Sequence, residues 1–312
     1  MGADRKYGGD AAIKTREDLD RALVYRDFRG FLKMWVWMIG YLREYDDYTL
    51  IGEAVARDLA RQNIRYVEGF FSPPDFRRST LDPQRTTEAL RAGVNRVPSI
   101  EIAFVADLVR DRGVEHARGL LERMGEVRSH GVIGIGLGGF EPGFPAELFA
   151  ATFERARALG FRTTAHAGEA AGAASVWGAV RALRVDRIGH ATRAAEDPAL
   201  VKYLAERRIP LELCPLSNVR TGIIKSVEAH PIRQYFDAGI AVSLNTDDPL
   251  FFGNSLAMEL ETAQRVHRFT RDEIRQVMLT SIEATWLSPE RKKRLAADFQ
   301  RDPSWTESGF FL

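Results

Sequence analysis

Seven short apolar runs recur at regular intervals along the chain. They are rich in Val, Ile, Leu and Phe, and they cover residues 64–71, 100–109, 132–139, 161–168, 185–192, 209–216 and 240–247. Runs that are apolar throughout, rather than alternating with polar residues, are typical of parallel strands buried on both faces. The pattern therefore predicts seven parallel strands.

Helical patterns separate these runs and follow the last of them. They cover residues 46–62, 84–95, 113–129, 145–159, 173–183, 197–208 and 230–238, then 254–268, 271–284 and 289–298. Strands that alternate with helices at this spacing predict βαβ units. We expect one domain over 1–312, with an irregular start at 1–20 and C-terminal helices within 250–312. An α/β barrel has eight strands, whereas an open doubly wound sheet can have seven, so the count leaves both folds open.

Polar residues and glycines gather where the later strands end. The groups are Gly138-Gly139, His166 with Glu169, His190, Ser217-Asn218 and Asn245-Thr246-Asp247-Asp248-Pro249. Each group alone has a structural explanation, such as a buried histidine, a turn or a helix cap. Together at one end of a barrel, where catalytic side chains of this fold lie, they predict an active site.

The charge balance and the single cysteine exclude several classes of protein. The chain has 44 basic and 43 acidic residues, which does not favour a nucleic-acid partner. Cys214 is the only cysteine, so no internal disulfide can form and a reducing compartment is expected. The start carries no signal-peptide pattern, and the apolar stretch 31–42 is too short to span a bilayer. We expect a cytoplasmic protein without membrane contact, and a buried or lid helix at 31–42.

The polar set fits metal-assisted hydrolysis. His166 and Asp247 are suitable zinc ligands at strand ends. Bound zinc lowers the pKa of its water to about 7 and so provides a nucleophile at neutral pH. A nearby histidine can orient that water or accept its proton, and a carboxylic acid can protonate the substrate.

Four motifs in this order resemble the adenosine deaminase family of the amidohydrolase superfamily. They are HAGE at 166–169, RIGH at 187–190, CPLSN at 214–218 and NTDDP at 245–249, and YVEGFFSPPDF at 66–76 and DFRGFLKMWVWM at 27–38 fit the same family. The resemblance implies a TIM-type (β/α)8 barrel and a zinc-dependent aminohydrolase. Its reaction would convert a 6-aminopurine, such as adenosine, adenine or aminodeoxyfutalosine, to the 6-oxo product and ammonia.

The resemblance also implies roles for the catalytic residues. His166 and Asp247 would be zinc ligands. Glu169 would protonate purine N1, which requires a raised pKa. His190 would orient or deprotonate the water that attacks C6.

Further residues would hold the substrate. By the same resemblance, Asp248 would hydrogen-bond purine N7 and the backbone N–H of Gly139 would meet N3. Phe31, Leu32 and Trp35 would form an apolar lid that excludes water from the reaction. Read from periodicity alone, these three residues are equally well explained as an ordinary helix core.

The chain departs from the family at its first strand. That strand carries His-x-His in the family, but the first of the six histidines here is His116, and no two are one residue apart. We therefore expect the first barrel strand and two zinc ligands to be missing, by truncation rather than by natural loss of the metal. Zinc binding is then expected to be weak or absent in this chain. The alternative is a metal-deficient homologue that binds purines or acts as a scaffold. A homo-oligomer is possible.

Smaller departures and one charged cluster complete the predictions. Ala191 replaces the family's usual glycine and could crowd the substrate, and Phe140 stands where an acidic residue is common, with Glu141 beside it. Arg77 and Arg78 follow a strand on the functional side. They could meet an anionic group of the substrate, although solvated surface arginines are the more ordinary explanation.

Overall fold

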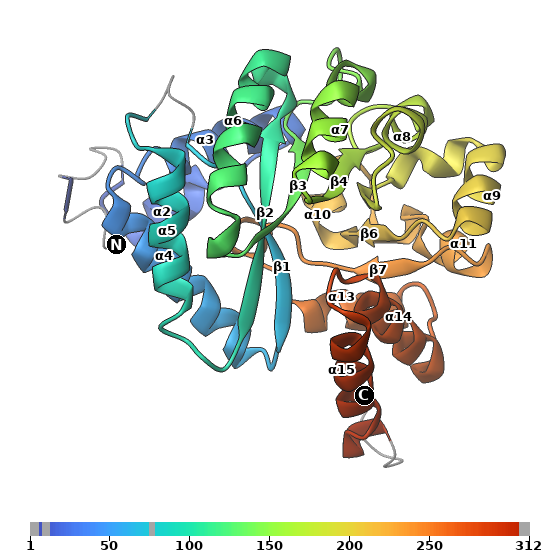
Figure 1. Cartoon of the computed structure of the whole chain (residues 1–312). Coiled ribbons are helices and arrows are strands. Elements are labelled where there is room, and N and C mark those ends of the chain that lie inside the picture. Colours follow the sequence, from blue (N-terminus) through green and yellow to red (C-terminus); the bar gives the residue numbers. More distant parts are fainter. Residues whose placement is uncertain (1–5, 8–12, 75–78, 306–312) are drawn as a thin grey trace.

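The chain forms a curled sheet of seven parallel strands. The computed structural model describes residues 6–7, 13–74 and 79–305. The strands are β1 (Tyr66–Phe71), β2 (Glu101–Val109), β3 (Val132–Gly138), β4 (Arg162–Ala167), β5 (Arg187–His190), β6 (Leu211–Leu213) and β7 (Val242–Leu244). They pair in sequence order from β1 to β7 (Figure 1). The predicted TIM-like barrel with seven strands is confirmed, and among the described residues β1 and β7 form the two edges of the sheet.

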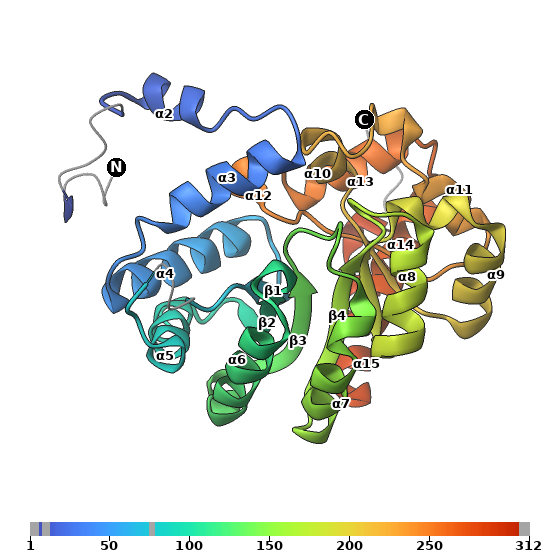
Figure 2. The ribbon, with the colours of Figure 1, turned by 90° about the horizontal axis from the view of Figure 1, so that it is seen from above.

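Helices follow most strands and return the chain to the start of the next one. They are α2 (Arg16–Ala22), α3 (Phe28–Ile39), α4 (Tyr45–Arg61), α5 (Pro83–Val94), α6 (Val114–Glu126), α7 (Ala150–Ala158), α8 (Ala173–Gly178), α9 (Pro198–Arg207), α10 (Pro215–Arg220), α11 (Ile232–Asp237), α12 (Pro249–Phe252), α13 (Leu256–Arg265), α14 (Arg271–Ala284) and α15 (Pro289–Gln300). Seen from above, α4 to α9 follow one another around the outside of the sheet (Figure 2). Helix α2 lies partly in the segment expected to be irregular.

The last strands are shorter than predicted, because the chain turns at their carboxyl ends. β6 ends at Leu213, and Pro215 begins α10, an unpredicted helix. β7 ends at Leu244, and Pro249 begins the unpredicted α12. Proline at the first helical position loses no hydrogen bond, so it starts a helix readily after a strand. The apolar run was therefore a poor guide to where each strand stops.

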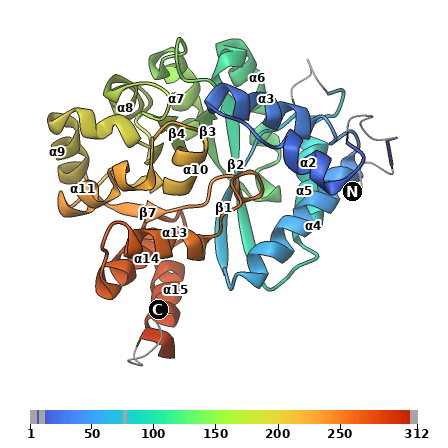
Figure 3. The same cartoon turned by 180° about the vertical axis from the view of Figure 1, so that it is seen from behind.

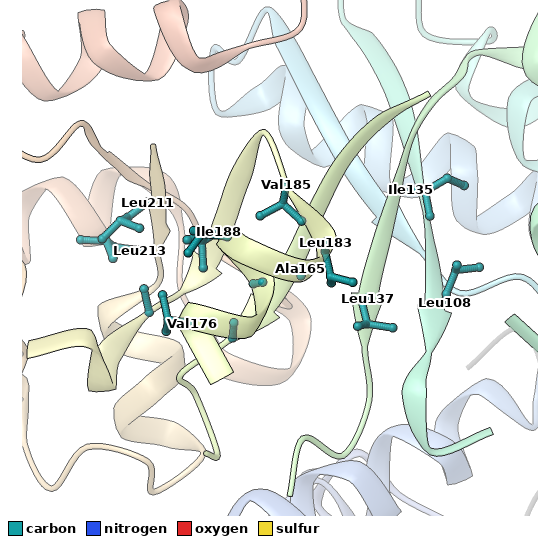
Figure 4. Packing of buried hydrophobic residues seen from close by; sticks show 14 of the residues in the cluster. Leu108, Ile135, Leu137, Ala165, Val176, Leu183, Val185, Ile188, Leu211 and Leu213 are labelled. Carbon is teal, nitrogen blue, oxygen red and sulfur yellow. The ribbon is translucent and has the colours of Figure 1, made fainter. Parts of the chain in front are cut away.

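The outer face of the sheet packs against the helices. Leu108 of β2, Leu137 of β3 and Ile188 of β5 are fully buried in one apolar cluster. Figure 4 shows these side chains with Val176 of α8 and Leu183 just after it. Burying a side chain of this size contributes about 1.5–3 kcal/mol, so the contacts in this layer stabilise the packing of the helices on the sheet.

The inner face of β3 carries only glycines at its alternate positions, Gly134, Gly136 and Gly138. Side chains from other elements fill the space that these glycines leave. At Gly134 the indole ring of Trp286 does so, and a β-carbon there would overlap it. Trp286 arrives from the loop after α14, so this loop closes the amino-terminal end of the barrel.

A buried ion-pair network holds Trp286 in place. Arg187 of β5 pairs with Glu68 of β1, and its Nε lies 3.1 Å from Oε1 of Glu212 on β6. The guanidinium carbon of Arg187 is 3.8 Å from the centre of the Trp286 ring. The backbone N–H of Trp286 donates to Oε1 of Glu68 at 2.6 Å. Strands β1, β5 and β6 and the loop after α14 are thus joined by one network of polar contacts.

Helix α3 lies across the opposite, carboxyl-terminal end of the strands (Figure 3). Asp27 begins it by accepting a hydrogen bond from the backbone N–H of Gly30 at 2.7 Å. Phe31 and Met34 are buried against Phe252 of α12. Within the described ranges, none of the helices has the length and apolar character needed to cross a bilayer.

We predict that Gly134→Ala destabilises the fold by about 1–3 kcal/mol, because the added methyl group must displace the indole ring of Trp286. Urea unfolding measures the change. Gly119→Ala in α6 is the matched control, since a β-carbon there meets nothing within 4 Å. The control should be neutral or more stable by up to about 1 kcal/mol, as expected for Gly→Ala in a helix. Equal stability of the Gly134 variant and wild type would contradict this packing.

Candidate active site

Two histidines meet at the carboxyl ends of β4 and β5. Nδ1 of His166 lies 2.9 Å from Nε2 of His190, and Nδ1 of His190 lies 3.0 Å from Nδ2 of Asn218. His190 has a φ of 63° and Ala191 a φ of 51°, which is the left-handed region. Two consecutive residues other than glycine in this region are strained. The family's glycine after this histidine would adopt that conformation without strain, so Ala191 costs stability here.

Two carboxylates flank the histidine pair. Oε2 of Glu169 lies 3.7 Å from Nε2 of His190, and Oδ2 of Asp247 lies 3.9 Å from the same atom. Oγ of Ser217 donates to Oδ2 of Asp247 at 2.6 Å, and Asp247 has a φ of 57°. The structure thus brings together four of the residues that the motifs singled out.

Burial and neighbouring charges shift the proton affinities of these groups. Burial raises the pKa of Glu169 to about 7, repulsion from Asp247 adds to this shift, and attraction to His190 opposes it. Burial alone would lower the pKa of His190, but Glu169 and Asp247 outweigh it and raise that pKa. Burial, together with the charge of His190, lowers the pKa of His166 well below its ordinary value. The arrangement therefore keeps a carboxylic acid partly protonated beside a basic imidazole at neutral pH.

Asp248, which follows Asp247 in the chain, also has a shifted proton affinity. Burial and repulsion from the adjoining Asp247 raise its pKa well above the ordinary value. Asp248 is therefore held in its protonated form, in which a carboxyl group can donate as well as accept a hydrogen bond.

Glu141 anchors the loop that carries Glu169. Its buried carboxylate accepts four backbone N–H groups, from residues 168 to 171, at 2.7–3.1 Å. Gly168 begins this loop with a φ of 69°, and its carbonyl accepts from Oγ1 of Thr192 at 2.7 Å. Sequence reasoning noted Glu141 only as the neighbour of Phe140. Its position two residues after the Gly138-Gly139 pair was the available signal.

Arg110 joins the ends of β3 and β4, and the sequence analysis missed it. Backbone pairing between these strands covers only Gly134 with Arg162 and Ile135 with Thr163. Beyond that point the fully buried guanidinium of Arg110 links the two strands by hydrogen bonds. It donates to the carbonyl oxygens of Leu137 at 3.0 Å, Gly138 at 3.3 Å and His166.

Gly139 turns the chain at the end of β3. It has a φ of 85°, and a β-carbon there would overlap Oδ1 of Asp111. The same oxygen accepts from the backbone N–H of Phe140 at 3.1 Å. A glycine is required at this position for both reasons. Whether its N–H meets a substrate stays a prediction.

The expected lid trio lies on α3, but a different part of that helix borders the cavity. Phe31 is buried, and Leu32 and Trp35 are partly buried, in the cluster around Phe252. A cavity of about 530 Å³ lies beside them, and its lining includes Phe28, Arg29, Phe140, Glu169, Arg193 and Ile224. Phe31, Leu32 and Trp35 are not among the lining residues. They brace the helix, and its first turn faces the cavity.

The predicted role of the arginine pair stays a prediction. Arg77 and Arg78 lie outside the described residues. Among the described residues, the cationic groups that line the cavity are Arg29, whose guanidinium lies 5.0 Å from the centre of the Phe140 ring, and Arg193. Nε of Arg193 is already paired with Oε1 of Glu196 at 2.7 Å.

The donor atoms present fit a metal ion. One nitrogen each from His166 and His190 and one oxygen from Glu169 lie within 4.8 Å of one another, and a second group joins His190, Cys214 and Asp247. Two imidazoles and a carboxylate are one of the ligand sets found in catalytic zinc sites. Burial raises the pKa of the Cys214 thiol well above its ordinary value, which makes the second group less suitable. His190 thus belongs to both groups, whereas the sequence had suggested only His166 and Asp247.

We predict that Glu169→Gln changes the pH dependence of stability in the metal-free protein. The carboxyl group has an ordinary pKa of 4.5 and a folded-state pKa of about 7. Between these values the unfolded chain releases its proton first, so the free energy of unfolding falls as pH rises. Glutamine cannot titrate, so the variant gains roughly 3 kcal/mol on wild type across this window.

Thermal unfolding at pH 4.5 and pH 8 measures this effect. The difference in Tm between variant and wild type should be larger, in favour of the variant, at pH 8. The same difference at both pH values would show that Glu169 is not held in a protonated state.

Comparison with known proteins gives a consistent family. The family described as adenosine deaminase matches residues 10–301. The chain is 34% identical to an aminodeoxyfutalosine deaminase of Streptomyces avermitilis, over 93% of this chain and 82% of that relative. It is 36% identical to an adenosine deaminase of Edwardsiella ictaluri, over 86% of this chain and 82% of the relative.

Solved structures agree with the sequence comparison. An adenine deaminase of Arthrobacter aurescens matches with a TM-score of 0.91 and 25% identity, over 98% of this chain and 94% of that one. An amidohydrolase of Burkholderia ambifaria with bound zinc matches with a TM-score of 0.88 and 27% identity, over 98% and 85%. The chain therefore belongs to the adenosine deaminase family of amidohydrolase enzymes.

Proposed function

We propose that the protein is a metal-dependent aminohydrolase that converts a 6-aminopurine to the 6-oxo purine and ammonia. The observation that carries this proposal is the contact between Glu169 and His190. A carboxyl group with a pKa of about 7 lies 3.7 Å from an imidazole whose own pKa is raised. Hydrolytic deamination needs a proton donor for the ring and a group that handles the proton of water, and this pair supplies both.

Each residue has a task that its environment supports. Glu169 donates a proton to purine N1, which makes C6 more electrophilic. Asp248 is protonated because burial and Asp247 raise its pKa, so it can donate to N7, an acceptor on the neutral purine. His190 holds and moves the proton of the attacking water. Gly139 offers its backbone N–H to N3.

His166 and Asp247 are the residues that would hold zinc, which leaves Glu169 and His190 to handle protons. When bound, zinc supplies Lewis acidity that lowers the pKa of water to about 7. The zinc-bound amidohydrolase among the similar structures supports this choice of metal. The relatives act on aminodeoxyfutalosine, adenosine or adenine by their names, and the substrate class here is the 6-aminopurine that these compounds share.

We predict that the purified protein, supplied with Zn²⁺, shifts the ultraviolet band of one of these three aminopurines as the 6-oxo product forms. Glu169→Gln should lower kcat by about 10²- to 10⁴-fold, because general acid catalysis contributes that much. Glu206→Gln, at an exposed ion pair on α9, is the matched control and should retain wild-type activity. Metal analysis before and after dialysis against a chelator, followed by zinc addition, tests the metal requirement.

Two results would contradict the proposal. One is the absence of turnover in zinc-loaded protein on all three substrates. The other is wild-type activity of Glu169→Gln. Purine binding without turnover would support the alternative of a metal-deficient purine-binding homologue.

A further inference from the structure

Asp107 is a buried acid at the site that the protein itself does not satisfy. It lies near the carboxyl end of β2 and is 8% exposed. Its Oδ1 atom is buried and has no hydrogen-bond partner among the described residues. Burying an unpaired polar oxygen costs roughly 1–3 kcal/mol, and more if it is charged, so such a group is usually explained by a ligand or a function.

Two glycines of β3 make the space for this carboxyl group. Asp107 pairs with Gly136 in the register between β2 and β3. Oδ1 of Asp107 lies 2.8 Å from the position that a β-carbon of Gly136 would occupy, and a β-carbon at Gly138 would overlap Oδ2. A larger residue at either position would push Asp107 away. The run of alternating glycines therefore has a steric purpose at this point.

The neighbouring arginine does not satisfy Asp107 by a hydrogen bond. Arg110 directs its guanidinium to the carbonyls of Leu137, Gly138 and His166. Burial raises the pKa of Asp107 to about 7, which attraction to Arg110 opposes and repulsion from Asp247 and Asp111 supports. The carboxyl group thus keeps free acceptor capacity on the inner face of the barrel.

Phe70 of β1 connects the surroundings of Asp107 to those of the histidine pair. Phe70 of β1 is 43% exposed although its ring lies on this inner face. Its Cε1 atom is 2.9 Å from the same point beside Gly136 that Oδ1 of Asp107 approaches. The centre of the Phe70 ring is 5.5 Å from that of His166. A ligand that packs on the exposed ring of Phe70 beside His166 would therefore also lie next to Asp107.

The chemistry of purines suggests what Asp107 accepts. Asp107 touches Gly138, and the next residue, Gly139, offers the N–H that is assigned to purine N3. On a purine, N9 lies on the same edge as N3, one carbon away. In a free base N9 carries a hydrogen, and in a ribonucleoside the 2′-hydroxyl reaches this edge. Both groups are donors beside N3.

We propose that Asp107 is a substrate-binding residue that selects 6-aminopurines carrying a hydrogen-bond donor beside N3. The donor is either the N9–H of a free base or the 2′-hydroxyl of a ribonucleoside. This inference rests on the proposed function, because that function places the purine with N3 at Gly139. It adds a residue outside the recognised motifs and a criterion that divides the candidate substrates.

Paired ligands that differ only in this donor test the proposal. Calorimetry compares purine with 9-methylpurine, and purine riboside with its 2′-deoxy form, and none of these carries the reacting amine. At pH 8, above the pKa of Asp107, the zinc-loaded wild type should prefer the donor-bearing member of one pair by about 10- to 100-fold, since a hydrogen bond to an ionised group is worth that much. A preference within the first pair identifies a free-base enzyme, and one within the second pair a ribonucleoside enzyme.

Variants then assign the preference to Asp107. Asp107→Ala should reduce it to less than about 3-fold, and Asp107→Asn, which keeps the shape and one acceptor oxygen, should reduce it several-fold. If the alanine variant does not fold, as judged by circular dichroism, the asparagine variant decides. Glu212→Gln is the control, because it removes a carboxylate from the other end of the barrel, where Glu212 pairs with Arg187. It should leave the preference unchanged.

The outcomes separate this inference from the proposed function. No preference within either pair in wild type, or an undiminished preference in both Asp107 variants, would overturn the role of Asp107. The turnover of adenine against 9-methyladenine, and of adenosine against 2′-deoxyadenosine, should show the same preference in kcat/KM. Deamination of all four compounds at similar rates would sink the inference while supporting the proposed function. A preference in binding without any turnover would contradict the proposed deaminase activity but not the role of Asp107 in binding.

Discussion

The site depends on one buried guanidinium. Backbone pairing between β3 and β4 stops at Ile135 and Thr163, below the level of the catalytic groups. Arg110 continues the connection by donating to carbonyl oxygens of both strands. Buried carbonyls without a donor are costly, so the diverging strands could not end here without such a group. Because one strand leads to Gly139 and the other carries His166, Arg110 sets the spacing of the two sides of the site.

Glu141 fixes the position of the loop that carries Glu169, as Arg110 fixes the ends of β3 and β4. Four backbone N–H groups, from residues 168 to 171, donate to its carboxylate, and one of them belongs to Glu169. Glu169, the proposed proton donor, is therefore held by main-chain contacts and not by its own side chain, which stays available for substrate. Precise placement of reacting groups by such supporting contacts is a large part of catalytic efficiency.

The same burial that equips the site also costs stability. Glu169, Asp107 and Asp248 lie close enough that their charges repel, and removal from water raises the pKa of each. Left-handed backbone at His190 and Asp247 adds strain. The closely packed outer layer opposes these costs by burying apolar side chains. Burial that raises the pKa of a carboxyl group also makes it a proton donor at neutral pH, which the proposed deamination needs.

Local pattern was a good guide to the strands and helices and a poor guide to their ends. Apolar runs located all seven strands, because both faces of a parallel sheet are covered. The helices after Leu213 and Leu244 were missed, because a proline and a positive φ decide the turn and periodicity does not register them. Polar residues at strand ends identified His166, Glu169, His190 and Asp247, since parallel strands place their carboxyl ends together.

The sequence by itself determined the parallel sheet, the end at which the chemistry lies and the family motifs, because these follow from local patterns. Only the tertiary structure decided the roles of Arg110, Glu141 and Asp107. Asp107 sits inside an apolar run and Arg110 just after it, and each looks like an ordinary polar residue there. What distinguishes them is the contacts that they make or lack with β3 and β4, segments 27 or more residues away. Side-chain contacts between distant segments arise only when the barrel closes around them.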